Sequence, residues 1–164
     1  MSRPKISVLF VSLTLSLVAI GWTLIRTAQK HDASILGKLS EEFAEDARFD
    51  KVHFTVRAGT VSLKGSVRVL EDKRQAARRA RAVDHVGSVT NDITVETRRI
   101  PDGILRIQLK HDLRKQGLNG LKLKVRRGVV TVRGTVPSNR ERVLTLVAGT
   151  EGVRGIRDRT MALE

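Results

Sequence analysis

The residues best suited to chemistry in this sequence are basic side chains that recur at strand spacing in its second half. Lys122, Lys124 and Arg126 alternate with apolar residues, and Arg133 stands in the apolar run that follows. Alternate residues of a β-strand point to the same face of a sheet, so these cations are expected to share one open face. Concentrated positive charge attracts polyanions such as anionic lipid, nucleic acid or acidic polysaccharide. The pattern therefore predicts a binding surface.

A second candidate surface is the outer side of a predicted helix within residues 103–115. At 100° per residue, Leu105, Leu109 and Leu113 fall on the core side of this helix. Apolar side chains bordered by bases are typical of a helix that lies in a membrane interface. The alternative is that the two isoleucines of the outer side pack against the other half of the chain. The residues of the outer side are Ile104, Ile107, Lys110, His111, Arg114 and Lys115.

Other residues with catalytic or metal-binding potential form no recognisable motif. The sequence has no cysteine, which excludes a thiol nucleophile and a cysteine metal site. The four histidines lack metal-ligand spacing, and the densest acidic cluster lacks the residue order of a calcium loop. We therefore expect no metal, no cofactor and no enzymatic activity, and a solvent-exposed role for His53 and for the acidic cluster. The histidines are His31, His53, His85 and His111, and the cluster is Glu41, Glu42, Glu45 and Asp46.

The N-terminus carries an apolar segment long enough to cross a membrane. Residues 6–25 contain no charge, and Lys5 and Arg26 flank them. A helix of this length spans about 30 Å, the thickness of the hydrocarbon core of a bilayer. We expect residues 1–31 to be a signal anchor in the inner membrane, with the domains in the periplasm. The alternative is a signal peptide cleaved near residues 19–21, which would leave the protein secreted to the periplasm.

A repeat organises the remaining residues. The stretches VHFTVRAGTVSLKGSV at 52–67 and LKLKVRRGVVTVRGTV at 121–136 share their alternation of apolar and polar residues. This alternation predicts two half-buried strands in each copy. Gly59 and Gly128 stand at the same place between the strands, where a hairpin turn needs a positive φ. Each stretch is therefore expected to be a β-hairpin.

Each hairpin also has a glycine inside its second strand, at Gly65 or Gly134. A glycine within a strand often marks a close approach of another backbone. Residues 71–83 are predicted to be helical, with Ala76 and Ala80 on one face. We expect this face of small side chains to lie close over Gly65.

Each copy is expected to follow the order helix, strand, strand, helix, strand. Asp32 or Ser34 is expected to cap the first helix of copy one, and Asp102 that of copy two. The predicted fold class is α+β, with two small domains that each have a three-stranded mixed sheet and two helices on one face, after an N-terminal transmembrane helix. Units of this size have thin cores, so we expect them to pack together. The closing strands are expected near 89–95 and 156–163, and the domains at 32–97 and 102–164.

This arrangement resembles the BON domain, the bacterial OsmY and nodulation domain. The resemblance lies in the glycine-turned hairpin, the alanine-rich helix and a closing strand with asparagine. Copy two departs from it at Asp158 and Thr160, which replace asparagine and isoleucine. The resemblance implies a non-catalytic envelope module that binds phospholipid membranes. The residues that carry it are Val56, Gly59, Val61, Leu63, Gly65, Val67, Val86, Val89, Asn91, Ile93 and Val95, and then Val125, Gly128, Val130, Val132, Gly134, Val136, Val153 and Ile156.

The net charge of +14 is concentrated in the second copy. Residues 101–164 hold 14 basic and six acidic residues, whereas residues 32–100 hold 13 and 11. We therefore expect copy two to face the polyanion. The predicted function is a membrane-anchored, non-catalytic envelope protein whose tandem domains bind anionic phospholipid. The candidate lipid-binding residues are Ile104, Ile107, Lys110, Arg114, Lys115, Lys122, Lys124, Arg126 and Arg133.

Two other classes of partner are compatible with this composition. A periplasmic chaperone or scaffold that binds other envelope proteins would use the charge for solubility. Nucleic acid is not expected, because base-stacking platforms need exposed aromatic residues. The aromatic residues after the N-terminal segment are Phe43, Phe49 and Phe54, all at predicted core positions.

Overall fold

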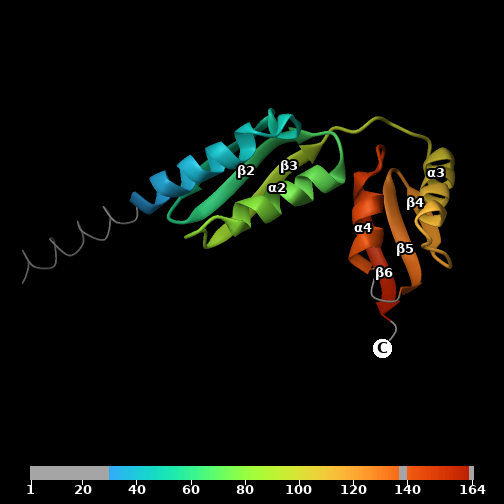
Figure 1. Ribbon diagram of the computed structural model, residues 1–164. Helices are drawn as coiled ribbons and strands as arrows, with labels where there is room; N and C mark the ends of the chain where they lie inside the picture. Colours follow the sequence, from blue (N-terminus) through green and yellow to red (C-terminus); the bar gives the residue numbers. More distant parts are fainter. Residues whose placement is uncertain (1–29, 137–139, 163–164) are drawn as a thin grey trace, which may run out of the picture.

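The computed structural model describes residues 30–136 and 140–162. Its first half is one unit of helices and strands, which is drawn in blue to green in Figure 1. Residues 30–44 are helical. The elements that follow are a short 3₁₀ helix η1 (Ala47–Phe49), β1 (Val52–Arg57), β2 (Thr60–Val67), α2 (Leu70–Ala82) and β3 (Ser88–Val95).

The second half repeats this order. Its elements are α3 (Asp102–Lys115), β4 (Lys122–Arg126), β5 (Val129–Val136), α4 (Arg140–Gly149) and β6 (Gly155–Ala162). The closing strands β3 and β6 therefore begin one residue earlier than the sequence pattern indicated. The loss of the asparagine and isoleucine in copy two does not prevent β6 from forming.

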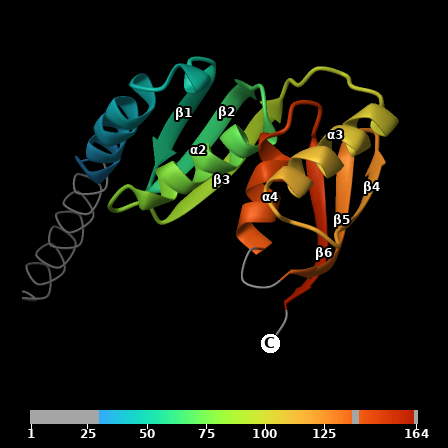
Figure 2. The same ribbon diagram turned by 45° about the vertical axis from the view of Figure 1, so that its right-hand side comes forward.

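Each half contains a three-stranded mixed sheet with its helices on one face (Figure 2). The strand orders are β1-β2-β3 and β4-β5-β6. In each sheet the first two strands are antiparallel and the last two are parallel. The predicted α+β class, with two helices over one face of each sheet, is confirmed for the part of the chain that the structure describes.

The apolar residues of the helices and of the covered sheet faces form two separate cores. In the second domain, Leu105, Leu109 and Leu113 of α3 are buried against Val130 and Val132 of β5. The first domain has the same arrangement, in which the first helix and α2 cover β2. Its buried residues include Ile35, Leu39, Phe43, Val61, Leu63, Ala76, Ala80 and Ile93.

Both hairpins turn through two residues with positive φ. Ala58 and Gly59 have φ of 47° and 73°, and Arg127 and Gly128 have φ of 51° and 75°. Two consecutive positive values define a type I′ turn, whose twist matches that of the strands it joins. The predicted glycine-dependent hairpins are therefore confirmed.

The glycine inside β2 lies against the backbone that leads into β1. A Cβ atom on Gly65 would lie 1.9 Å from the carbonyl oxygen of Lys51, which directly precedes β1. The same oxygen accepts a hydrogen bond from the Ser66 N–H at 3.3 Å. Gly65 is thus required by the approach of the adjacent strand.

The predicted helix caps were also wrong. Asp102 is the first residue of α3, and the preceding Pro101 occupies the cap position without a side-chain hydrogen bond. Asp32 and Ser34 lie within the helical residues 30–44. The carboxylates of Asp32 and Asp102 instead reach the hairpin turns, where positive φ values orient successive N–H groups toward an anion.

The two domains contact each other through a few residues around their linker. Leu70 and Ile100 are partly buried against the core of the second domain. The Gly152 N–H donates a hydrogen bond to Thr97 Oγ1 at 2.6 Å. Arg74 on α2 and Glu141 on α4 approach to 3.6 Å. The expected packing of the domains is therefore present, although it involves few side chains.

The predicted membrane span at 6–25 lies outside the described residues. Among residues 30–136 and 140–162, no helix combines the length and the apolar character needed to cross a bilayer.

Candidate functional site

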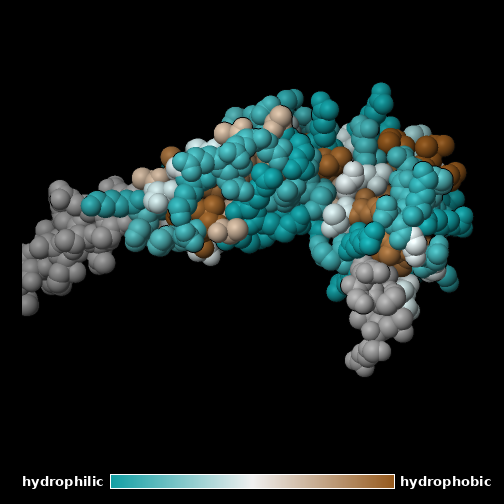
Figure 3. All heavy atoms as spheres, in the orientation of Figure 1, coloured by the Kyte–Doolittle hydropathy of each residue, from teal (hydrophilic) through white to brown (hydrophobic). Residues whose placement is uncertain are grey.

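The outer side of α3 exposes two large apolar side chains. Ile104 and Ile107 are 57% and 65% exposed, whereas Leu105 and Leu109 on the inner side are fully buried. The 3.6-residue period of the helix produces this separation. Figure 3 shows apolar surface at the end of the second domain where Figure 1 places α3. The alternative that these isoleucines pack against the first domain does not hold in the described structure.

Basic residues border the exposed isoleucines on α3. Lys110, Arg114 and Lys115 are all exposed, and Arg106, also exposed, directly precedes Ile107 in the sequence. The matching helix of the first domain exposes Leu36, which is 44% accessible. That helix carries an acidic cluster where α3 is basic. Among the described residues of these two helices, the large exposed apolar side chains with a cationic border are therefore those of α3 in the second domain.

A second cationic surface covers the open face of the second sheet. The strand register places Lys122 opposite Arg133, and Arg133 in turn opposite Arg159. Paired residues share a face, so these three cations form a row across the sheet. All three are exposed. The predicted set on β4 and β5 is brought together here, and β6 enlarges it.

Two of these basic residues were missed by the sequence reasoning. Arg157 and Arg159 project from the open face of β6, alternating with Asp158 on the covered side. A comparison of this strand with its counterpart offered a signal, because Arg159 aligns with Asp92 in β3. The six cations of the open face are Lys122, Lys124, Arg126, Arg133, Arg157 and Arg159.

Small residues along the centre of this face create a hollow of about 840 Å³. Val129 and Thr131 of β5 form its floor, while longer basic side chains from the neighbouring strands form its walls. Gly155 lies opposite Val129 in the register and adds no side chain to that wall. The residues that line the hollow are Asp102, Lys124, Arg126, Arg127, Val129, Thr131, Arg133, Arg157 and Arg159. We refer to this hollow as the sheet groove.

Asp102 is the one acidic residue that lines the sheet groove. Its carboxylate accepts hydrogen bonds from the backbone N–H groups of Arg127 and Gly128, at 2.8 and 3.0 Å. These two hydrogen bonds lower the pKa of Asp102 below its usual value. Asp102 therefore stays ionised at neutral pH and is already engaged with the hairpin turn.

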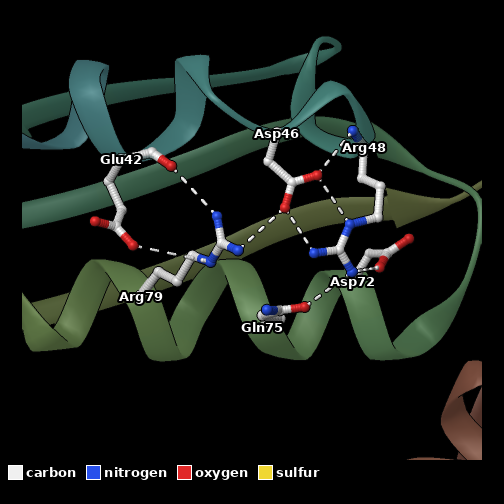
Figure 4. A network of polar contacts seen from close by, with 6 residues as sticks. All are labelled: Glu42, Asp46, Arg48, Asp72, Gln75 and Arg79. Carbon is white, nitrogen blue, oxygen red and sulfur yellow. Dashed lines mark hydrogen bonds and ion pairs between the residues drawn. The ribbon is translucent and has the colours of Figure 1, made fainter.

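None of the six cations on the open sheet face forms an ion pair with an acidic residue of the described chain. The first domain uses its basic residues differently, as Figure 4 shows. Arg48 contacts Asp46 at 2.6 Å and Asp72 at 3.0 Å, and Arg79 contacts Asp46 at 3.0 Å. Both guanidinium groups also lie over the ring of Phe49. These arginines hold the first domain together.

The carboxylates of this network have pKa shifts of opposite sign. Hydrogen bonding and charge from Arg48 lower the pKa of Asp46 to about 2. Burial raises the pKa of Asp72, although Arg48 acts in the opposite direction. The side chain of Gln75 accepts a further hydrogen bond from Arg48 at 3.1 Å. The network is structural, because each polar group in it faces another residue of the same domain.

Asp158 occupies the covered side of β6, where the first domain has Asn91. Burial opposes its ionisation, but hydrogen bonds from Thr160 and Arg140 outweigh that effect and lower the pKa of Asp158. The Arg140 contact measures 2.6 Å. Asp158 therefore neutralises Arg140 on the covered side, and the charged residues on the open face of β6 are both arginines.

The two cationic surfaces lie on opposite layers of the second domain. The buried leucines of α3 pack against β5, so the outer side of α3 points away from the sheet. The six sheet cations point to the uncovered side. One flat surface cannot contact both layers at once, and the nine predicted residues therefore divide into two sites.

Metal binding has no support in the described residues. No group of three or more histidine, aspartate and glutamate side chains within them has the geometry of a metal site. His53 is exposed on the open face of the first sheet, as predicted. His31 and His85 stack with their ring centroids 5.0 Å apart.

Comparison with known families identifies the repeated unit. The BON domain model matches residues 31–97 and 101–160. The chain belongs to the BON domain family. Each match contains one hairpin, one alanine-rich or valine-rich helix and one closing parallel strand, so the protein is a tandem BON protein. Comparison with curated proteins found no match to the chain.

Solved structures show only a distant likeness to this tandem. Two structures of CdsD, described as a structural protein of the type III secretion system of Chlamydia trachomatis, are 13% identical with a TM-score of 0.37. One of them is described as the C-terminal domain. The matches cover 79% of this chain and 92% and 98% of the CdsD chains. A likeness this low carries no inference about the tandem BON protein.

Proposed function

We propose that this tandem BON protein is a non-catalytic envelope protein whose second domain docks on an anionic phospholipid membrane through the outer side of α3. The observation that carries the proposal is the exposure of Ile104 and Ile107 among Lys110, Arg114 and Lys115. The known association of BON domains with phospholipid supports the class of ligand.

The energetics favour an interfacial position for α3. Each lysine or arginine close to an anionic membrane contributes about 1 kcal/mol, and the attraction fades over about 8 Å at physiological ionic strength. Full burial of one isoleucine side chain contributes about 1.5–3 kcal/mol, and burial in an interface contributes less. Charge would therefore bring the helix to the membrane, and the two isoleucines would hold it there.

The first domain is not part of the proposed contact. Its first helix and the turn after it expose Glu41, Glu42 and Glu45, and an anionic membrane repels these carboxylates. Glu41 and Glu45 take the places that His111 and Lys115 have on the outer side of α3. The first domain would therefore act as a spacer between the N-terminal segment and the docking domain.

The location that fits this proposal is the inner membrane, with residues 6–25 as a single-pass anchor and both domains in the periplasm. The charge-free sequence of that segment supports the assignment. Measurement of the mass of the mature protein tests it, because a mature chain starting near Trp22 would mean a cleaved signal peptide.

The docking proposal is tested with a fragment of residues 30–164, which contains every described residue but not the apolar segment. Its co-sedimentation with anionic vesicles is compared with that of two variants: Ile104→Ser with Ile107→Ser, and Lys110→Gln with Arg114→Gln and Lys115→Gln. Both variants should bind at least about tenfold more weakly, since each removes one part of the interaction. Circular dichroism checks their folding.

Retention of full vesicle binding by the folded isoleucine variant would rule out the α3 contact. Equal binding of the unaltered fragment to zwitterionic and anionic vesicles would rule out the electrostatic part. Leu36→Ser in the first domain is a control, because Leu36 is also an exposed apolar residue on a helix but lies outside the proposed contact. It should leave vesicle binding unchanged.

A further inference from the structure

The sheet groove is a second anion site that the membrane proposal does not use. It lies on the layer opposite α3, so its cations would face away from a membrane on which α3 lies. Only this orientation depends on the membrane proposal. The groove itself is defined by the register of β4, β5 and β6 and by its lining residues.

The charge arrangement of this face opposes folding. Arg133 has a cation directly across from it on each side, Lys122 on β4 and Arg159 on β6. Like charges placed opposite each other on neighbouring strands are destabilising. The first sheet avoids this arrangement by placing Asp92 opposite Lys64. An anion bound between the three cations would remove the repulsion in the second sheet.

The shape of the groove favours an elongated ligand. Its floor runs along β5, and its walls are basic residues of the two flanking strands. Alternate residues along a strand are about 6.6 Å apart, and the flanking strands are separated by about twice the 4.8 Å strand spacing. Successive anionic groups of an extended chain would therefore meet Arg126 at the Val129 step, a pair of flanking cations at the Thr131 step, and another pair around Arg133.

The side-chain chemistry favours phosphate. Four of the six cations are arginines, whose planar donor groups match the oxygen atoms of phosphate and carboxylate. A carboxylate has two oxygens in one plane, whereas a phosphate presents oxygens on several sides. A phosphate above Val129 and Thr131 would accept hydrogen bonds from Arg126 on one wall and from Arg157 on the other. None of the residues lining the groove is aromatic, so bases would find no stacking surface.

We propose that the sheet groove of the second BON domain binds a water-soluble ligand with several linked phosphate groups, aligned along β5. Cations continue beyond the end of the groove, where Arg127 also lines a neighbouring hollow with Arg98, Arg99 and Arg154. A chain of phosphates longer than the groove would therefore continue over the hairpin turn toward the linker.

The proposal is tested by calorimetric titration of the full-length protein in a neutral detergent with sodium tripolyphosphate. One variant removes three groove charges, by Arg133→Gln, Arg157→Gln and Arg159→Gln. The matched control removes three charges from α3, by Lys110→Gln, Arg114→Gln and Lys115→Gln. The groove variant should bind tripolyphosphate at least about tenfold more weakly, and the α3 control should stay within about twofold of the unaltered protein.

Three outcomes would overturn the proposal. The first is that the unaltered protein shows no saturable binding of tripolyphosphate. The second is an equal loss in both variants, which would mean that only the total charge matters. The third is equal affinity for citrate, a small anion with three carboxylates, which would remove the preference for phosphate. Circular dichroism and the melting temperature check that each variant is folded.

Vesicle binding separates this proposal from the membrane proposal. The same three glutamine substitutions in the 30–164 fragment should leave co-sedimentation with anionic vesicles within about twofold of the unaltered fragment, whereas the α3 substitutions should reduce it. If the groove variant instead lost vesicle binding and the α3 variants kept it, the groove would be the lipid site. Both proposals would then be wrong.

Discussion

The carboxylate of Asp102 accepts a hydrogen bond from the backbone N–H of Gly128 at 3.0 Å, and so joins the first residue of α3 to the turn between β4 and β5. Asp32 and Gly59 form the same contact in the first domain at 2.9 Å. The helix and the hairpin that it covers are thus connected by a charged hydrogen bond in both copies. This contact also fixes the end of the sheet groove nearest the linker.

Asp102→Asn should loosen the turn of the second hairpin and lower the melting temperature of the second domain. The substitution removes the negative charge that two backbone N–H groups share. Amide hydrogen exchange at Arg127 and Gly128 should become faster, while exchange in the first domain stays unchanged. Asp112→Asn is a suitable control, because it makes the same change in charge further along α3. Unaltered exchange at the two turn amides would contradict the proposed role of Asp102.

Gly65→Ala should destabilise the first domain strongly. Gly65 has a φ of 120°, and a Cβ atom there would collide with the carbonyl oxygen of Lys51. Backbone strain of this kind costs about 1–3 kcal/mol, and the collision adds to it. Gly37→Ala is the control, since Gly37 is helical and a Cβ atom meets nothing within 4 Å. It should stabilise the protein by roughly 0.5–1 kcal/mol. Urea unfolding measures the free energy of unfolding of both variants. A loss of stability in Gly65→Ala that is no larger than the cost of backbone strain alone would contradict the collision.

The first domain should lose stability as the pH falls from about 4 to about 2. The folded pKa of Asp46 is about 2, below the ordinary value of 3.8. A carboxyl group with a lowered folded pKa stabilises the protein above its unfolded pKa, and this contribution disappears as the pH falls toward the folded value. The raised pKa of Asp72 opposes part of this loss, because its protonation favours the folded state.

Asp46→Asn should therefore reduce the free energy of unfolding at pH 7. It should also make the loss of stability between pH 4 and pH 2 smaller. Glu45→Gln, on the adjacent exposed position, should leave both quantities as they are. Urea unfolding at pH 7, 4 and 2 gives the comparison. An Asp46→Asn protein that kept the full acid sensitivity would show that other carboxylates cause it.

The strands and helices of both domains could be predicted from the sequence, because apolar residues that recur at the period of a strand or a helix mark the buried face of that element. The alternation of Lys122 and Lys124 with apolar residues placed them correctly on the open face. The spacing of Leu105 and Leu109 likewise placed Ile104 on the outer side of α3. Local periodicity is sufficient where every second or every fourth residue is apolar.

The remaining features depend on contacts between distant residues. Arg157 and Arg159 were missed because β6 is mostly polar, so its alternation does not reveal which side is buried. The covered position of Asp158 depends on Arg140, which belongs to another element. The wrong cap at Asp102 has the same origin, since the sequence does not show that a hairpin turn 25 residues away offers two N–H groups.

Arg159→Asp should stabilise the second domain, because it would place a carboxylate opposite Arg133. The first domain already has this arrangement in the pair of Asp92 and Lys64. Opposite charges across neighbouring strands contribute about 0.2–1 kcal/mol relative to alanine, and removal of the like-charge pair adds to the gain. The free energy of unfolding should therefore rise while tripolyphosphate binding falls. A stabilised protein that no longer binds would indicate that the cation row is maintained for a ligand.

Two further substitutions separate this effect from a general loss of net charge. Arg157→Asp makes the same change in charge on the same strand, but the residue opposite it is Thr131, so the gain in stability should be smaller. Asp92→Arg places a second cation opposite Lys64 in the first sheet and should destabilise that domain. Thermal unfolding at low and high salt compares the three variants, and the differences should shrink as salt screens the charges. If Arg159→Asp and Arg157→Asp raised the stability equally, the gain would come from the reduced net charge and not from the contact with Arg133.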